Sequence, residues 1–230
     1  MQIDTASGYE GRYAIGYAMS LGFEVLPPEV APVVVLDTSI QLLRLQRAGA
    51  DLVFLQMHAE PAGAILRNAE RLGLLDEFQF AGHSEAIGDR TIKVAGVAGT
   101  EGFLASRPYP WFDEPEVPGI KLMIDNMMKY HGKVGKEGGY VFGWMSAAVV
   151  CEAISRAIEN VGYENLDGPA LKEALDGMKD FDVHGLASIT YKPDDHRGAT
   201  KMAVYEVRGG KLARVSDWQE APVARDWEYK

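Results

Sequence analysis

The sequence predicts an α/β protein with a mostly parallel sheet and helices on both of its faces. Short apolar runs at residues 52–55 and 78–81 have the length of buried strands, and we expect the first to be buried on both faces. Apolar residues then recur at helical spacing over 64–74, with charged residues between them. Strand and helix patterns alternate in this way up to Phe103, which is typical of parallel strands joined by crossover helices.

The bulk composition is that of an ordinary globular protein. The chain has 230 residues, enough for one large domain or two small ones, with 47% apolar and 24% charged residues. Its net charge of -10 argues against a nucleic-acid partner, because phosphates would be repelled. We find no run that approaches the roughly 20 apolar residues needed to cross a bilayer.

The start of the chain does not resemble a signal peptide, and its one cysteine excludes two kinds of cysteine site. Residues 1–11, MQIDTASGYEG, lack the basic end and the apolar core of a signal peptide. The single cysteine, Cys151, excludes an intramolecular disulfide and any multi-cysteine metal site. Cys151 lies in an apolar helical run, so we expect a buried, inert thiol.

The elements of the first part follow from local patterns. Gly22 ends a helix that begins near Tyr13, and Pro27-Pro28 ends a strand over 23–26. Asp37, Thr38 and Ser39 offer N-caps for the next helix. In order, we expect a loop at 4–11, helix 13–21, strand 23–26, helix 39–46, strand 52–55, helix 64–74, strand 78–81, a short helix 86–93 and strand-like 94–103.

The composition changes after Phe103. Residues 106–115 form a rigid, aromatic, proline-rich connector. Three helices follow without a strand between them, over 119–130, 139–160 and 169–178, and the middle one is apolar nearly all round, which is typical of a buried helix. The tail predicts strands at 189–191, 202–207 and 212–215, with Gly209-Gly210 as a hairpin turn.

Seven segments in order carry a resemblance to a known family. They are 4–11 (DTASGYEG), 45–53 (LQRAGADLV), 64–73 (AILRNAERLG), 97–102 (VAGTEG), the alanine-rich helix 143–160, the short helix region 167–175 and 190–198 (TYKPDDHRG). Together they resemble the substrate-binding proteins of branched-chain amino acid ABC transporters, which have the type I periplasmic binding fold.

The resemblance implies two lobes. Residues 1–105 and 181–220 would form lobe two, residues 106–180 the helical part of lobe one, and residues 221–230 a C-terminal tail. It also implies that the chain begins inside lobe two and lacks the sheet of the N-terminal half-lobe. The apolar helix 139–160 would then have no sheet to cover, so we expect self-association through the exposed helices of 119–178.

The candidate ligand-binding residues follow strands or strand-like stubs. Ligands of α/β sheets bind at the carboxyl ends of the strands, where Gln56 and His58 lie. The resemblance adds Tyr9, Ser84 and Glu85. For Tyr9 the alternative is a surface tyrosine, because the order Gly8-Tyr9 reverses the family pattern. For His58, which could donate to a ligand carboxylate, the alternative is a capping or solvent-facing histidine.

The loop at 83–85 bears on the class of ligand. In amino-acid binders an acidic residue of this loop pairs with the ligand's ammonium group, and here Ser84 takes that place with Glu85 one residue later. A neutral or acidic small molecule, such as an amide or an aromatic carboxylate, is therefore an alternative to an α-amino acid as the ligand. His58, His83 and Glu85 could also bind a metal, but they lack motif spacing and we expect no metal.

Motifs of catalysis are absent from the sequence. We find no Gly-x-Ser-x-Gly, P-loop, Gly-x-Gly-x-x-Gly or His-Glu-x-x-His pattern, and we expect neither an enzyme nor a cofactor. The run 194–197, Asp-Asp-His-Arg, resembles a reactive cluster, but we interpret it as a structural turn.

The function implied by the resemblance is that of a solute-binding component of an ABC importer. It would hold a small amino acid or related amide or carboxylate between two lobes and deliver it to a membrane permease. The expected location is periplasmic, or extracellular with a lipid anchor, and high-affinity binding would be impaired without the missing half-lobe. The alternative is a self-contained flavodoxin-like α/β enzyme or ligand-sensing domain.

Overall fold

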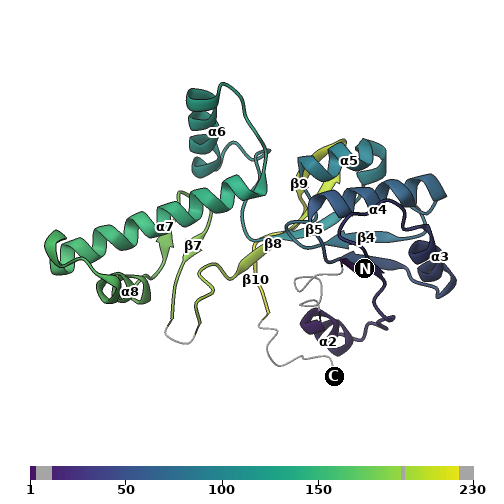
Figure 1. Ribbon diagram of the computed structural model, residues 1–230, viewed down its shortest axis with the longest axis horizontal. Coiled ribbons are helices and arrows are strands. Elements are labelled where there is room, and N and C mark those ends of the chain that lie inside the picture. The colour runs from purple at the N-terminus through teal and green to yellow at the C-terminus, as the bar shows by residue number, and fades with distance from the viewer. Residues whose placement is uncertain (4–11, 193–194, 223–230) are drawn as a thin grey trace. The chain divides into compact units, whose positions relative to one another are not determined.

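The computed structural model describes residues 1–3, 12–192 and 195–222 of the chain (Figure 1). The chain forms two compact units, one of residues 1–107 with 202–230 and one of residues 108–201. Residues 181–201, which the sequence analysis placed with the first group, thus lie in the second unit. The assignment of these units to the lobes of a family stays a prediction.

A mixed sheet organises the first unit. Its strand order is β10-β8-β5-β4-β3, with β9 paired to β8. The strands β3 (Leu52–Leu55), β4 (Gln79–Gly82) and β5 (Leu104–Arg107) are parallel, whereas β8 (Lys201–Arg208) runs antiparallel to β5. β9 (Lys211–Arg214) returns from β8 through the expected Gly209-Gly210 turn, and β10 (Gln219–Glu220) lies at the edge.

A short parallel pair continues from the end of β3. β1 (Gln2–Ile3) pairs with β2 (Val30–Ala31), and Gln2 also bridges Gln56 in parallel register. The amide of Gln56 donates to the carbonyl of Met1 at 2.9 Å. The expected strand over 23–26 is wrong, because the strand in this region begins after Pro27-Pro28, at Val30.

Four helices of the described first unit accompany this sheet. They are α2 (Arg12–Ser20), α3 (Ser39–Arg47), α4 (Ala59–Leu72) and α5 (Asp89–Thr100). α4 and α5 lie side by side in close contact (Figure 1). A Cβ built on Gly63 would lie 2.8 Å from the carbonyl oxygen of Thr91, so the helices approach closely only because this residue is glycine.

The expected strand-like segment over 94–103 is wrong. α5 reaches Thr100, with a break at Gly96 (φ 84°, ψ 166°), and the strand is the later segment Leu104–Arg107. The small residues of VAGVAG suggested strand alternation. In the structure they belong to α5, which packs against α4; a Cβ on Gly99 would lie 2.9 Å from Oε2 of Glu70, the end of a flexible side chain.

One face of the parallel sheet is buried more completely than the other. Along β3, Val53 and Leu55 are buried, whereas Leu52 and Phe54 are 44% and 39% exposed. The expectation that both faces of this strand are buried is therefore wrong. The apolar run alone could not show it, because alternation is hidden when all four residues are apolar.

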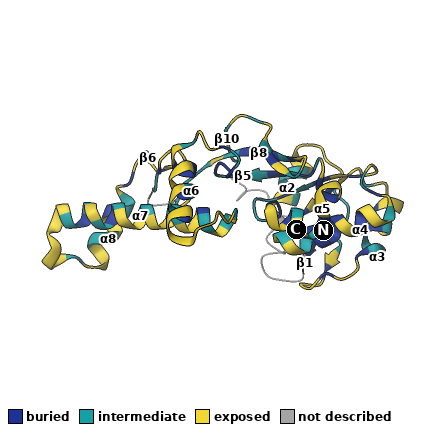
Figure 2. Cartoon of the chain, turned by 90° about the horizontal axis from the view of Figure 1, so that it is seen from above, coloured by how far each residue is buried: buried dark blue, intermediate teal, exposed yellow. Residues whose placement is uncertain are grey.

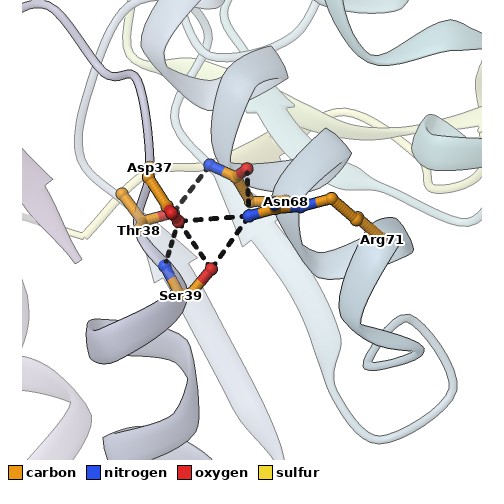
Figure 3. A network of polar contacts seen from close by, with 5 residues as sticks. All are labelled: Asp37, Thr38, Ser39, Asn68 and Arg71. Atoms are coloured by element: carbon orange, nitrogen blue, oxygen red, sulfur yellow. Dashed lines mark hydrogen bonds and ion pairs between the residues drawn. The ribbon is translucent and has the colours of Figure 1, made fainter.

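A polar network joins the start of α3 to α4 (Figure 3). The buried Asn68 donates from Nδ2 to the buried Thr38 Oγ1 at 3.3 Å. Arg71 Nη2 donates to Asp37 Oδ1 at 3.3 Å and to Ser39 Oγ at 3.0 Å. Asp37 also accepts from the amide of Ser39, the residue that begins α3. These contacts hold the N-terminus of α3 against α4.

The second unit is mostly helical, as the sequence predicts. It contains α6 (Pro118–His131), α7 (Gly138–Val161), a 3₁₀ turn (Tyr163–Asn165) and α8 (Gly168–Asp176). The short hairpin of β6 (Phe181–Asp182) and β7 (Ser188–Ile189) follows. Tyr109 and Trp111 from the proline-rich connector are buried, and Tyr109 meets Phe142 of α7 edge to face.

α7 is far more exposed than an apolar helix usually is, and exposed residues recur along it (Figure 2). By length and composition it could cross a membrane, and 22% of its most apolar window is buried. The expectation that no run approaches a membrane span is therefore wrong, although core helices of soluble proteins have similar composition. Cys151 is exposed, so the expectation of a buried thiol is also wrong.

Candidate functional site

The carboxyl ends of β3 and β4 meet at one edge of the sheet. Leu55 of β3 pairs with Gly82 of β4, so the two chains leave the sheet at the same level. Residues 56–58 continue from β3, and residues 83–85 continue from β4. The register thus brings together two of the segments that the sequence analysis selected.

The segment after β3 turns directly into α4. Met57 is buried and Gln56 is half-buried. His58 occupies the N-cap position of α4 without a capping hydrogen bond from its side chain, and it is exposed. Of the alternative for His58, a capping or solvent-facing histidine, the capping hydrogen bond is therefore not made, whereas its exposure fits a solvent-facing side chain.

The segment after β4 forms a tight turn. The amide of Glu85 donates to Nδ1 of His83 at 3.2 Å, and the amide of Ala86 donates to the carbonyl of His83 at 3.0 Å. Gly82 precedes the turn, and a Cβ there would lie 2.8 Å from the Cβ of Ala86. The side chains of His83, Ser84 and Glu85 are all half-buried.

His83 connects the two segments. Burial lowers the pKa of His83, the charge of Glu85 opposes this, and the nearby His58 and a hydrogen bond with the Met57 backbone have smaller effects. Because Nδ1 accepts a hydrogen bond, the proton of the neutral ring lies on Nε2. His83 is therefore neutral at pH 7 and lies within electrostatic range of both His58 and Glu85.

The sequence analysis missed Arg107. It had been assigned to the proline-rich connector, but it is the last residue of β5 and is fully buried. Its Nη1 donates to the carbonyls of Ser84 at 3.0 Å and Ile87 at 2.9 Å. A charged residue just before Pro108, at the end of an apolar segment, was the one available signal.

The structure thus brings together Gln56, His58, Ser84 and Glu85, the four predicted site residues that it describes. Tyr9 and its loop lie outside the described residues. Across 1–3, 12–192 and 195–222, no group of three or more side chains is arranged to hold a metal ion. Asp195 and Arg197 form an ion pair at 2.7 Å within the expected turn, while Asp194 lies outside the described residues, so the turn stays a prediction.

The comparisons with known proteins agree with this architecture. The profile of the family described as periplasmic binding protein matches residues 2–211 of the chain. The chain therefore belongs to the periplasmic binding protein family. A comparison with curated proteins gives no significant match.

Solved structures show the same fold. A branched-chain amino acid ABC transporter protein from Thermus thermophilus, with bound valine, is similar at 26% identity and a TM-score of 0.84. The match covers 100% of this chain and 62% of that one. A fatty acid ABC transporter substrate-binding protein from Thermomonospora curvata is similar at 19% identity and a TM-score of 0.76, over 100% of this chain and 58% of that one.

A third similar structure is a possible leucine/isoleucine/valine-binding protein from Rhodopirellula baltica, at 19% identity and a TM-score of 0.76, with 94% of this chain and 57% of that one covered. The chain thus spans about three fifths of the length of these proteins. The family assignment favours the solute-binding interpretation over a self-contained flavodoxin-like enzyme or sensor.

Proposed function

We propose that this protein is the solute-binding component of an ABC importer and that its first unit supplies one wall of the ligand site. The observation that carries the proposal is the meeting of residues 56–58 and 83–85 at the carboxyl edge of a parallel sheet. This edge belongs to a chain of the periplasmic binding protein family.

The chemistry of this wall supports a small polar ligand. Gln56 can donate and accept, His58 can donate to a carboxylate, and Glu85 can accept from an ammonium or amide group. The proposed ligand is a small amino acid or a related amide or carboxylate. The valine bound to the Thermus thermophilus protein makes valine the first compound to test.

The remaining parts of the proposal rest on the family. The protein binds its ligand without transforming it and delivers it to a membrane permease. Its location is periplasmic, or extracellular with a lipid anchor. The net charge of -10 disfavours a nucleic-acid partner. Tyr9 is proposed as a further ligand contact, and the two compact units are proposed to correspond to parts of two lobes.

Titration by NMR tests this function. We expect L-valine, or another member of a panel of small amino acids, short amides and aromatic carboxylates, to shift the signals of Gln56, His58 and Glu85. Chemical shifts report weak as well as tight binding, so a ligand that binds with low affinity would also be detected. Calorimetry then gives the dissociation constant of the compound that binds.

One variant and a matched control sharpen the test. Glu85→Gln should weaken binding of an ammonium-bearing ligand about tenfold or more, because a charge-assisted hydrogen bond is lost, and should leave binding of a simple carboxylate unchanged. Arg67→Met removes an exposed cation from α4 and should change neither. If no compound in the panel shifts residues 56–58 or 83–85, the proposed site is wrong.

A further inference from the structure

Arg107 is a buried arginine whose environment is unusual for a strand end. Its side chain has 0% exposure, and burying a guanidinium is costly unless its N–H groups are satisfied. One nitrogen, Nη1, donates to two carbonyls three residues apart, those of Ser84 and Ile87. Both acceptors lie in the loop of residues 83–88 that joins β4 to α5, so a single side chain ties both halves of this loop.

The 83–88 loop has further hydrogen bonds, one within the loop and others from α5. Thr91 Oγ1 donates to the carbonyl of Ala86 at 2.8 Å, and the carbonyl of His83 accepts from the amide of Ala86. The carbonyl of Gly88 accepts from the amide of Ile92 at 3.1 Å, so with the two bonds from Arg107 five of the six carbonyls of this loop accept hydrogen bonds. The loop backbone is therefore held by Arg107 from the sheet, by donors of α5 and by one bond within the loop.

The anchor itself is rigid. Arg107 pairs with Ala203 in the antiparallel ladder between β5 and β8, so its backbone is fixed within the sheet. Buried side chains on rigid elements hold a functional group more accurately than contacts within a loop do. No ligand contact is required of Arg107 for this effect, because its side chain acts through the loop backbone.

We propose that Arg107 is a positioning residue that holds the 83–88 loop, and with it Ser84 and Glu85, in the conformation that binds ligand. The proposal rests on the proposed function in one respect, namely that this loop is a binding loop. It predicts that loss of the guanidinium loosens the loop selectively, while β3 and β4 remain intact.

Hydrogen exchange measures the loop without any ligand. In Arg107→Met, exchange of the Glu85 and Ala86 amides should rise about tenfold or more relative to the amides of β4, since buried carbonyls lose their donors. Arg107→Lys should give a smaller rise, because its shorter chain keeps a donor but places it one bond short of the carbonyls. Arg67→Met, which removes an exposed arginine of the same unit, should leave the loop unchanged.

Titration of the His83 ring by NMR gives a second readout. The pKa of His83 is lowered mainly by burial, so a loosened loop should return it toward its ordinary value in Arg107→Met. If Arg107→Met fails to fold, Arg107→Lys is compared with the wild type instead. Hydrogen exchange of the loop amides and the pKa of His83 then test whether Arg107 positions the loop.

Binding of L-valine is measured separately by NMR titration of the same proteins. Selective loosening of the loop together with a dissociation constant raised about tenfold or more would support the proposal. Unchanged exchange at residues 85–86, or an equal rise in the loop and in β4, would overturn it. Wild-type protein that binds no compound of the panel would contradict the proposed function, and the exchange results would still decide whether Arg107 positions the loop.

Discussion

His83 shows how one residue links the chemistry of the proposed site to its stability. The imidazole accepts a hydrogen bond from the Glu85 amide through Nδ1, which is possible only while that nitrogen carries no proton. Burial lowers the pKa of His83 in the folded state. Protonation thus competes directly with the hydrogen bond that shapes the turn.

This competition predicts a pH dependence of stability. Because the folded pKa of His83 is lower than the unfolded value of 6.5, the unfolded state binds more protons between the two values. The contribution of His83 to the free energy of unfolding is therefore fully present above pH 6.5. It is lost as the pH falls from 6.5 toward the folded pKa, and it is constant below that.

Thermal unfolding of the wild type and His83→Gln between pH 5 and pH 8 measures this contribution. We expect the melting temperature of the wild type to fall more steeply below pH 6.5 than that of the variant. Taking the difference between the two proteins removes the effect of the other titrating groups. Parallel curves for the two proteins would show that His83 is not the group responsible.

At the scale of elements, α4 and α5 demonstrate how small residues decide packing. Gly63 of α4 has no room for a side chain, since a Cβ would lie 2.8 Å from Thr91 O and from Val94 Cβ. Gly143 of α7 is also inside a helix, but nothing lies within 4 Å of the same built atom. The same substitution should therefore have opposite effects at the two positions.

We expect Gly63→Ala to lower the free energy of unfolding by about 1–3 kcal/mol, because overpacking forces the helices apart. Gly143→Ala should raise it by about 0.5–1 kcal/mol, because alanine favours the helix and meets no obstacle. Urea denaturation of both variants gives the comparison. A stabilised Gly63→Ala protein would mean that α4 and α5 separate at little cost.

At the scale of the whole molecule, the exposed apolar surface of α7 is the feature with the largest consequence. Val150 is 48% exposed, Phe142 is 38% exposed, and Cys151 is also exposed. Large apolar patches on soluble proteins mark interaction sites or cause association. Self-association through the helices of 119–178 therefore stays our prediction for the 230-residue chain.

Analytical ultracentrifugation across a range of protein concentrations tests this association. We expect the average mass to rise with concentration, and Val150→Glu to reduce the rise because a charge cannot be buried in the contact. Arg67→Glu, an exposed change on α4 in the first unit and outside residues 119–178, serves as the charged control. A monomer at every concentration would contradict the prediction.

Local patterns in the sequence were sufficient for most elements. The run at 52–55 forms β3, the run at 78–81 predicts β4 to within one residue, the three late helices are present, and Gly209-Gly210 forms the expected hairpin turn. Local patterns were insufficient over 94–103, where alanine and glycine fit a strand as well as a closely packed helix. Only contact with α4 distinguishes the two, and no local pattern contains that contact.

The sequence by itself determined the α/β class, the strand ends at Gln56 and His83, and the family resemblance, because these depend on short-range periodicity and on residue order. Only the tertiary structure decided that Leu52 and Phe54 face outward, that Cys151 is exposed and that Arg107 reaches the carbonyls of Ser84 and Ile87. Burial and long-range hydrogen bonds depend on which distant segments meet, and that is set by the packing of the whole chain rather than by neighbouring residues.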